Sequence, residues 1–269
     1  MPRNKLPPFD KYFYYLAAVQ SPEHDMRLVD RFYREAQPRG TSPTSMREDF
    51  CGTFANCCTW VRMGETRRAY GVDLDPEPLD WGREHHLAKL KPTQRDRVVL
   101  RRQNVLNADV PRVDAICALN FSYFIFKKRK QLGDYFTACR RGLKPGGVLV
   151  LDSFGGPGCA DANEERTDFD DPRFSYFWEQ RNFYPLTAEA EFQIHFKRPG
   201  EPKRKRVFVY DWRIWTIAEL KDLLEECGFR AVHTYWEGTT RDGGGDGRFR
   251  RTVRGEACEA WISYIVAQA

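Results

Sequence analysis

EDFCGTFAN at residues 48–56 and GVDLDP at residues 71–76 decide the fold. In each segment an apolar strand candidate runs directly into a helix candidate. Strands that alternate with helices in this way predict a parallel sheet covered on both faces. The turn within residues 48–56 then lies at the carboxyl ends of the strands, where open α/β sheets bind their ligands.

The alternation continues on both sides of these segments. Apolar strand candidates lie at Met46–Cys51, Ala69–Leu74, Arg97–Arg102, Val113–Leu119, Val148–Ser153, Ala231–Trp236 and Ala260–Ala267. Helix candidates lie between the earlier strands, at Ala55–Met63, Pro76–Leu90 and Lys128–Gly142. We therefore predict an α/β fold, a Rossmann-like and mostly parallel seven-stranded sheet with helices on both faces.

The pattern changes at about residues 172–213. Three strand candidates follow one another there without a helix between them, at Phe174–Tyr184, Glu189–Lys197 and Arg206–Trp212. Their period-two alternation predicts an antiparallel β insertion. A helix with a capping-box pattern then begins at Thr216–Glu219. The glycine-rich stretch Gly238–Glu256 is expected to be a loop.

Two further helix candidates, Asp10–Gln20 and Asp25–Glu35, precede the first strand. Ser21 and Pro22 between them suit the N-cap and the first helical position of the second helix. We expect residues 1–40 to form an N-terminal helical cap and residues 41–269 to form one domain that contains the insertion.

The composition narrows the class of protein. The 269 residues are 41% hydrophobic and carry a net charge of +5, and 14% are aromatic, which excludes a disordered chain. No stretch approaches the roughly 18 apolar residues of a membrane span, and the first residues lack the apolar core of a secretory signal. The eight Cys form no C-x-x-C pair, so we expect buried free thiols and a cytoplasmic location.

Asp73 and Gly52 indicate the kind of ligand. Asp73 ends the second strand 21 residues after Gly52, and an ionised carboxylate there is placed to accept hydrogen bonds from both hydroxyls of a ribose. A diphosphate needs several glycines in the preceding turn, whereas here Phe50 and Phe54 stand beside a single Gly52. These residues exclude NAD and FAD. They favour a cofactor that has adenine and ribose without phosphates.

The residues at 48–56, 71–76, 113–120 and 143–151 together resemble the successive motifs of the class I S-adenosylmethionine-dependent methyltransferases. The resemblance covers about residues 44–153, and its most specific piece is LKPGG at residues 143–147, before an apolar strand. The family usually reads D-x-G-x-G-x-G in its first turn, and this chain keeps only the middle glycine. The phrase REDFCGT at residues 47–53, with ALNFSY downstream, resembles a bacterial subgroup whose substrate we cannot name.

The resemblance implies S-adenosylmethionine as cofactor, together with a role for each matching position. Glu48 would close on the methionine end, Asp73 would hold the ribose, and Leu74, Asn104 and Val105 would contact the adenine. The full set of expected cofactor-binding residues is Tyr15, Gln20, Glu48, Cys51, Gly52, Thr53, Asp73, Leu74, Asn104, Val105, Leu119 and Asn120.

The acceptor is expected to be a small molecule, methylated at an amine nitrogen, because no His stands at the strand ends to activate an oxygen. Tyr123, His195 and Trp236 are candidates for its binding site, and Tyr123 is the one catalytic candidate. No metal, nucleic acid or membrane partner is expected, and the chain would be a monomer or homodimer.

Two alternatives remain open. An RNA or DNA methyltransferase would use the basic segment at residues 197–206, although the chain lacks the prolines of the nucleic-acid motif Asn-Pro-Pro-Tyr at Asn120–Tyr123. The other alternative is a non-catalytic cofactor-binding module with a degenerate loop.

Overall fold

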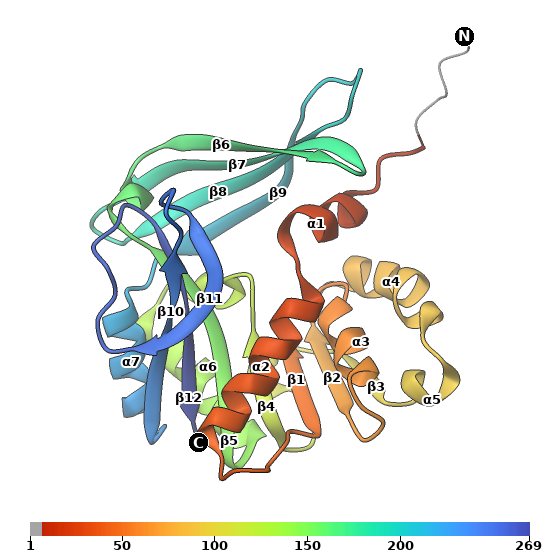
Figure 1. Cartoon of the computed structure of the whole chain (residues 1–269), viewed down its shortest axis with the longest axis vertical. Helices are drawn as coiled ribbons and strands as arrows, with labels where there is room; N and C mark the ends of the chain where they lie inside the picture. Colours follow the sequence, from red (N-terminus) through yellow and green to blue (C-terminus); the bar gives the residue numbers. More distant parts are fainter. Residues whose placement is uncertain (1–6) are drawn as a thin grey trace.

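A computed structural model describes residues 7–269 and contains two β-sheets (Figure 1). Within this range the larger sheet has the strand order β11-β10-β12-β5-β4-β1-β2-β3. Its parallel part consists of β1 (Ser45–Asp49), β2 (Arg68–Asp73), β3 (Val98–Arg102), β4 (Val113–Ala118) and β5 (Leu143–Gly155). The antiparallel part consists of β10 (Ala231–Thr239), β11 (Gly245–Thr252) and β12 (Trp261–Gln268). The predicted fold class is confirmed.

The expected count of seven strands was one too few. The additional strand, β11, lies in the stretch that we expected to be a loop, and it pairs with β10 at the edge of the sheet. Its sequence GDGRFRRT buries only Phe249, and Arg31 of the N-terminal region donates to the Phe249 carbonyl at 2.7 Å. An edge strand with one buried side chain has no apolar alternation that sequence reasoning could detect.

The smaller sheet is the predicted insertion, but it has four strands and begins at Asn163 rather than at about residue 172. Its order is β6 (Asn163–Asp170), β7 (Arg173–Tyr184), β8 (Glu189–Lys197) and β9 (Arg204–Arg213), all antiparallel. The strand that we missed, β6, is NEERTDFD, and almost all of it is exposed. The insertion lies above the carboxyl ends of the parallel strands (Figure 1).

Helices cover both faces of the larger sheet, as predicted. The α-helices are α1 (Lys11–Val19), α2 (Pro22–Ala36), α3 (Ala55–Arg62), α4 (Pro76–His85), α5 (Pro92–Arg95), α6 (Arg129–Gly142) and α7 (Ile217–Glu226). Short 3₁₀ turns lie at η1 (Leu87–Lys89), η2 (Val105–Asn107), η3 (Ser122–Ile125) and η4 (Pro157–Ala160). Buried side chains of α6 and α7 form one core, and those of α2, α3 and α4 form the core on the opposite face.

Local signals fix several of these elements. Thr216 and Glu219 form the predicted capping box at the start of α7, and Gly228 follows that helix with a φ of 87°. Alternate residues of β5 point to opposite cores: Leu149 and Leu151 join the α6 and α7 side, and Val148 and Val150 join the α2 side. This strand is therefore buried on both faces, as its continuous apolar run predicts.

The two N-terminal helices have different neighbours. Tyr14 of α1 packs against Phe174 and Phe196 of the insertion, with ring centroids 4.9 and 5.9 Å away. Met26 and Phe32 of α2 are buried in the core of the larger sheet. Of the expected cap at residues 1–40, residues 1–6 lie outside the described part. No helix within residues 7–269 is long and apolar enough to span a membrane.

Candidate functional site

The turn after β1 takes an unusual backbone path. Gly52 has a φ of 50°, and the bulky Phe50 and Phe54 also lie in the left-handed region, at 57° and 48°. A left-handed conformation costs a residue with a side chain roughly 1–2 kcal/mol. A Cβ atom added to Gly52 would meet nothing within 4 Å, so the space in front of this glycine is open.

Both phenylalanine rings of the turn pack away from this open space. Phe50 contacts the rings of Phe126 and Tyr135, with centroids 6.0 and 5.8 Å away. Phe54 is completely buried against Gly82 of α4, where an added Cβ would lie 2.5 Å from the Phe54 ring. Phe50 and Phe54 therefore stand in this turn without filling the side that faces the ligand. Phe54 can do so because Gly82 of α4 has no side chain and leaves room for its ring.

Asp73 lies at the end of β2, directly beneath the turn. One oxygen accepts the Gly52 N–H at 2.7 Å, and the other accepts the Asp75 N–H at 2.9 Å. Burial raises the pKa of Asp73, while these two N–H bonds favour the ionised form. A carboxylate offers about four acceptor positions, so two remain for a ligand. Leu74, next in sequence, is 61% exposed beside it.

Glu48 lies on the other side of the turn and is almost fully buried. Its carboxyl group accepts from the Asn56 amide at 2.8 Å and from the Cys57 thiol at 3.2 Å. Burial raises the pKa of Glu48 to about 8. The neighbouring Cys51 and Thr53 are also buried. The structure thus places Glu48 beneath the turn, with its carboxyl group already partnered.

Three predicted residues follow β3 and β4. Asn104 is exposed, and its side-chain oxygen accepts the Leu106 N–H at 3.0 Å, which caps η2. Val105 is buried in the core, and so is Leu119, whose carbonyl accepts the Ser122 hydroxyl at 2.7 Å.

Asn120 and Phe121 form a second strained turn, at the end of β4. Their φ values are 55° and 58°. The carboxylate of Asp152 accepts the Asn120 N–H at 2.7 Å and the Phe121 N–H at 2.9 Å. Burial raises the pKa of Asp152 to about 7, and the two N–H bonds oppose that shift. Asp152 is therefore the side chain that holds both left-handed residues in place.

A cavity of about 530 Å³ opens beside Asn120 and Phe121, between the insertion and the larger sheet. Tyr15 and Val19 of α1 form part of its wall. The aromatic lining residues are Tyr15, Phe121, Phe154, Tyr176, Trp178, Tyr210, Trp212 and Trp261, and the acidic ones are Glu165, Glu237 and Glu259. Among the described lining residues there is no Lys, Arg or His.

The insertion contributes its inner face to this cavity. Glu165 pairs across the sheet with Trp178, and Trp178 pairs with Ile194, so these three lie on one face. All three line the cavity. The tyrosine hydroxyls gather there as well: burial raises the pKa of Tyr15 to about 12, and the nearby Tyr210 hydroxyl lowers it.

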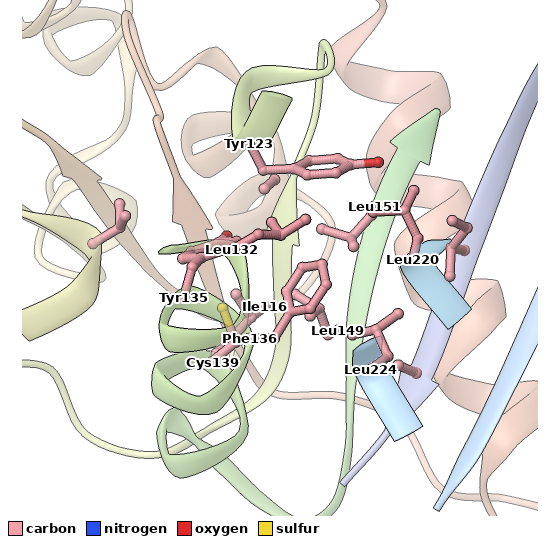
Figure 2. Packing of buried hydrophobic residues seen from close by; sticks show 14 of the residues in the cluster. Ile116, Tyr123, Leu132, Tyr135, Phe136, Cys139, Leu149, Leu151, Leu220 and Leu224 are labelled. Carbon is pink, nitrogen blue, oxygen red and sulfur yellow. The ribbon is translucent and has the colours of Figure 1, made fainter. Parts of the chain in front are cut away.

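The three predicted acceptor-binding residues lie outside this cavity lining. Tyr123 is wrong as a candidate because it is completely buried, donates to the Asp152 carbonyl at 2.9 Å and belongs to the core (Figure 2). His195 points to the opposite face of β8 from Ile194. There it is 1% exposed, its Nε2 lies 2.7 Å from Glu179, and its Nδ1 accepts the Arg206 N–H.

Trp236 is the third of these candidates. It packs on Trp261 with ring centroids 5.3 Å apart, and it is Trp261 that reaches the cavity. The neighbouring Glu237 also reaches the cavity.

α1 closes the site from the N-terminal side. Asp10 accepts the indole N–H of Trp81 on α4 at 2.8 Å, and Lys11 forms an ion pair with Glu77 at 2.7 Å. Tyr15, further along the same helix, lies in the wall of the cavity, and its contact with the cofactor stays a prediction. Gln20 ends the same helix, and its side-chain oxygen is buried without a hydrogen-bond partner within the described chain.

The basic segment at residues 197–206 is largely neutralised by neighbouring acids. Arg198 and Arg204 pair with Glu201, Lys203 pairs with Glu164, and Arg206 pairs with Glu191. A groove that binds a phosphate backbone needs unpaired cations. This pairing weighs against the nucleic-acid alternative.

Sequence reasoning missed Asp152 and most of the cavity. Asp152 had a visible signal, because it is a charged residue that follows the buried run Val148–Leu151. No sequence signal marks Glu237 and Glu259. They meet only because β10 and the segment before β12 pack beside the insertion in the folded chain.

Residues 49–151 match the family model described as "Methyltransferase domain". No curated protein matches the chain.

Solved structures resemble the whole chain in fold. An amino pentose methyltransferase from Micromonospora echinaspora, solved with SAM bound, has a TM-score of 0.66 at 16% identity and covers 99% of each chain. A sugar N-methyltransferase from a Streptoalloteichus species has a TM-score of 0.62 at 18% identity over 99% of this chain and 95% of that one. An S-adenosylmethionine-dependent methyltransferase from Clostridium acetobutylicum gives 0.64 at 17% identity over 94% and 96%.

Proposed function

We propose that this chain, an S-adenosylmethionine-dependent methyltransferase with the class I fold, transfers the methyl group to an amine nitrogen of a small molecule. The methyltransferase domain matched at residues 49–151 and the shared fold support the activity, the donor and a small-molecule acceptor. The amine nitrogen is the part that we infer from the site itself.

The residues around the first turn fit the donor. The open space in front of Gly52 leaves room for its amino-acid end, and Asp73 has two acceptor positions left for the ribose hydroxyls. Leu74, which is exposed beside Asp73, offers an apolar surface for the adenine. When bound, the donor supplies a methyl group on a positively charged sulfur atom. Tyr15 and Asn120 would enclose the reacting end.

The observation that carries the amine acceptor is the lining of the cavity next to Asn120. Its aromatic side chains attract cations through their ring faces, and its three glutamates attract them through charge. No cationic side chain of the described lining opposes them. An amine is protonated in water near neutral pH, so this cavity concentrates amines.

Nitrogen also suits the chemistry that these side chains can perform. A protonated amine must lose its proton before attack, whereas an alcohol needs a strong base. The described cavity lining contains no His to act as such a base. Its residues therefore bind, orient and keep water out, and well-oriented reactants gain about 7–11 kcal/mol from that alone.

The test is a methyl-transfer assay with labelled S-adenosylmethionine against pooled small amines and against the matching alcohols. We expect label in the amines only. Asp73→Ala should weaken donor binding by about tenfold or more, measured by titration calorimetry, because the ribose loses its acceptor. Asp80→Ala is the matched control, since Asp80 is an exposed acid of α4 that pairs with Arg83.

Two results would count against the proposal. Label that appears in alcohols but not in amines would remove the amine acceptor. Donor affinity that is equal in Asp73→Ala and Asp80→Ala would remove the ribose assignment.

A further inference from the structure

We propose that the acceptor carries a second cationic group besides the nitrogen that is methylated, and that Glu237 and Glu259 bind this second charge. The inference rests on the proposed function and narrows its substrate class to compounds with two basic centres. Substrates that carry a phosphate or another anion are disfavoured by the same lining.

The first step is the charge of the cavity. Glu165, Glu237 and Glu259 line it, and within residues 7–269 none of them forms an ion pair with Lys, Arg or His. Several other acids of the insertion are ion-paired. They are Glu164 with Lys203, Glu189 with Lys127 and Glu191 with Arg206. Three carboxylates without an ion pair therefore line the cavity in which we place the acceptor.

The second step is the chemistry of the nucleophile. An amine attacks only as the neutral species, and a carboxylate in contact with it stabilises the protonated form instead. Three carboxylates directed at the reacting nitrogen would therefore slow the transfer. Fast methyl transfer is compatible with this negative charge if most of the carboxylates pair with a second cationic group of the acceptor. That group keeps its proton, and the reacting nitrogen stays free to lose its own.

The third step is where the glutamates lie. Glu237 is near the end of β10, and Glu259 precedes β12, two residues before Trp261 of the cavity wall. The reacting end is next to Asn120, after β4. β10 and β4 are separated by three strand intervals, which is about 14 Å at roughly 4.8 Å each.

The wall between these two ends is aromatic, and it includes Trp212, Trp178 and Trp261. Glu237 also accepts the Gly247 N–H at 3.0 Å, which fixes its position without neutralising its charge. The second cation therefore binds several ångströms from the methylated nitrogen, between indole faces and the carboxylates of Glu237 and Glu259.

The experiment measures binding to the full chain saturated with S-adenosylhomocysteine. The probes are α,ω-diaminoalkanes from 1,4-diaminobutane to 1,8-diaminooctane, each compared with the monoamine of the same length by titration calorimetry. We expect the best diamine to bind about tenfold or more tightly than its monoamine. The amino acid 6-aminohexanoate should bind more weakly than hexylamine, because it carries an anion into the acidic end.

Variants locate the effect. Glu237→Gln and Glu259→Gln should each reduce the preference for the diamine while the affinity for S-adenosylhomocysteine stays unchanged. Glu164→Gln is the matched control, because Glu164 lies on the opposite face of β6 from Glu165 and pairs with Lys203. It should leave the preference unaltered.

The outcomes separate this inference from the proposed function. If diamines and monoamines bind equally, if neither binds at millimolar concentration, or if both glutamine variants keep the preference, the second-cation inference is wrong. Methylation of monoamines together with diamines would still support the proposed function. Failure of the chain to bind S-adenosylhomocysteine would instead overturn the proposed function.

Discussion

Asp152 shows how one buried carboxylate can shape a site that it does not line. It holds Asn120 and Phe121, whose left-handed conformations each cost roughly 1–2 kcal/mol. Both of those residues line the cavity, whereas Asp152 does not. We therefore regard Asp152 as a positioning residue for the acceptor end of the site.

Asp152→Asn should lower kcat by about tenfold and change the donor KM much less. The amide can accept only one of the two N–H bonds, so the turn after β4 loses its geometry while the first turn is unaffected. Steady-state kinetics with varied donor and acceptor measures this split. Asp134→Asn, at an exposed acid of α6 that pairs with Lys130, is the control. If the donor KM of Asp152→Asn rises by as large a factor as kcat falls, a positioning role at the acceptor end is contradicted.

At the scale of elements, α1 is the part of the chain that connects the site's components. Asp10 caps its first turn through the backbone N–H groups of Tyr12 and Phe13, and the same carboxylate accepts from Trp81 of α4. Tyr14 connects α1 to the insertion. The helix therefore contributes to the cavity wall while it contacts two separate structural units, α4 and the insertion.

Trp81→Phe should loosen α1 by removing the indole N–H while it keeps the ring that stacks on His85. A hydrogen bond to a charged group contributes about 1.5–3 kcal/mol. We expect faster proteolysis within residues 10–20 and several-fold weaker donor binding. Added donor should slow proteolysis of the helix in the wild type and in Trp81→Phe. Arg83→Ala on α4 serves as the comparison. Unchanged proteolysis in Trp81→Phe would show that this bond does not hold α1.

The elements also show where sequence reasoning succeeds. The parallel strands were predictable because β5 is apolar on both faces and because Gly52 in the turn after β1 and Asp73 at the end of β2 have the expected spacing. The edge strands β6 and β11 were not, since strands that bury one face or less leave no hydrophobic period. The positions of Asp73 at the end of β2 and of Asn120 after β4 could be predicted from the order of the elements. Trp178, Glu165 and Glu237 required knowing how the insertion packs on the larger sheet.

For the whole molecule, buried carboxylates determine how stability depends on pH. Burial raises the pKa of Glu48 to about 8 and that of Asp152 to about 7. Each group binds its proton more strongly in the folded protein, so its stabilising contribution is complete at low pH and is lost as pH rises through the folded pKa. His86 has the opposite effect at lower pH, because burial lowers its pKa from 6.5 to about 4.

The free energy of unfolding should therefore fall between about pH 7 and pH 8, where His86 is mostly neutral in both states while Glu48 and Asp152 lose their protons in the folded protein. Urea denaturation across this range, without donor, measures the slope. Glu48→Gln should make the slope shallower, because the amide does not ionise. A slope in Glu48→Gln as steep as in the wild type would mean that Glu48 already ionises normally in the folded state.

The close approach of Gly82 to Phe54 couples two distant parts of the sequence. A Cβ at position 82 would lie 2.5 Å from the Phe54 ring and 2.3 Å from the carbonyl oxygen of Thr53, so the side chain and the backbone of the turn both require glycine there. A relative that keeps phenylalanine at position 54 should therefore keep glycine at position 82. A sequence search that requires a glycine-rich turn after the first strand would overlook chains like this one. In them a glycine of α4, rather than of the turn, provides the space.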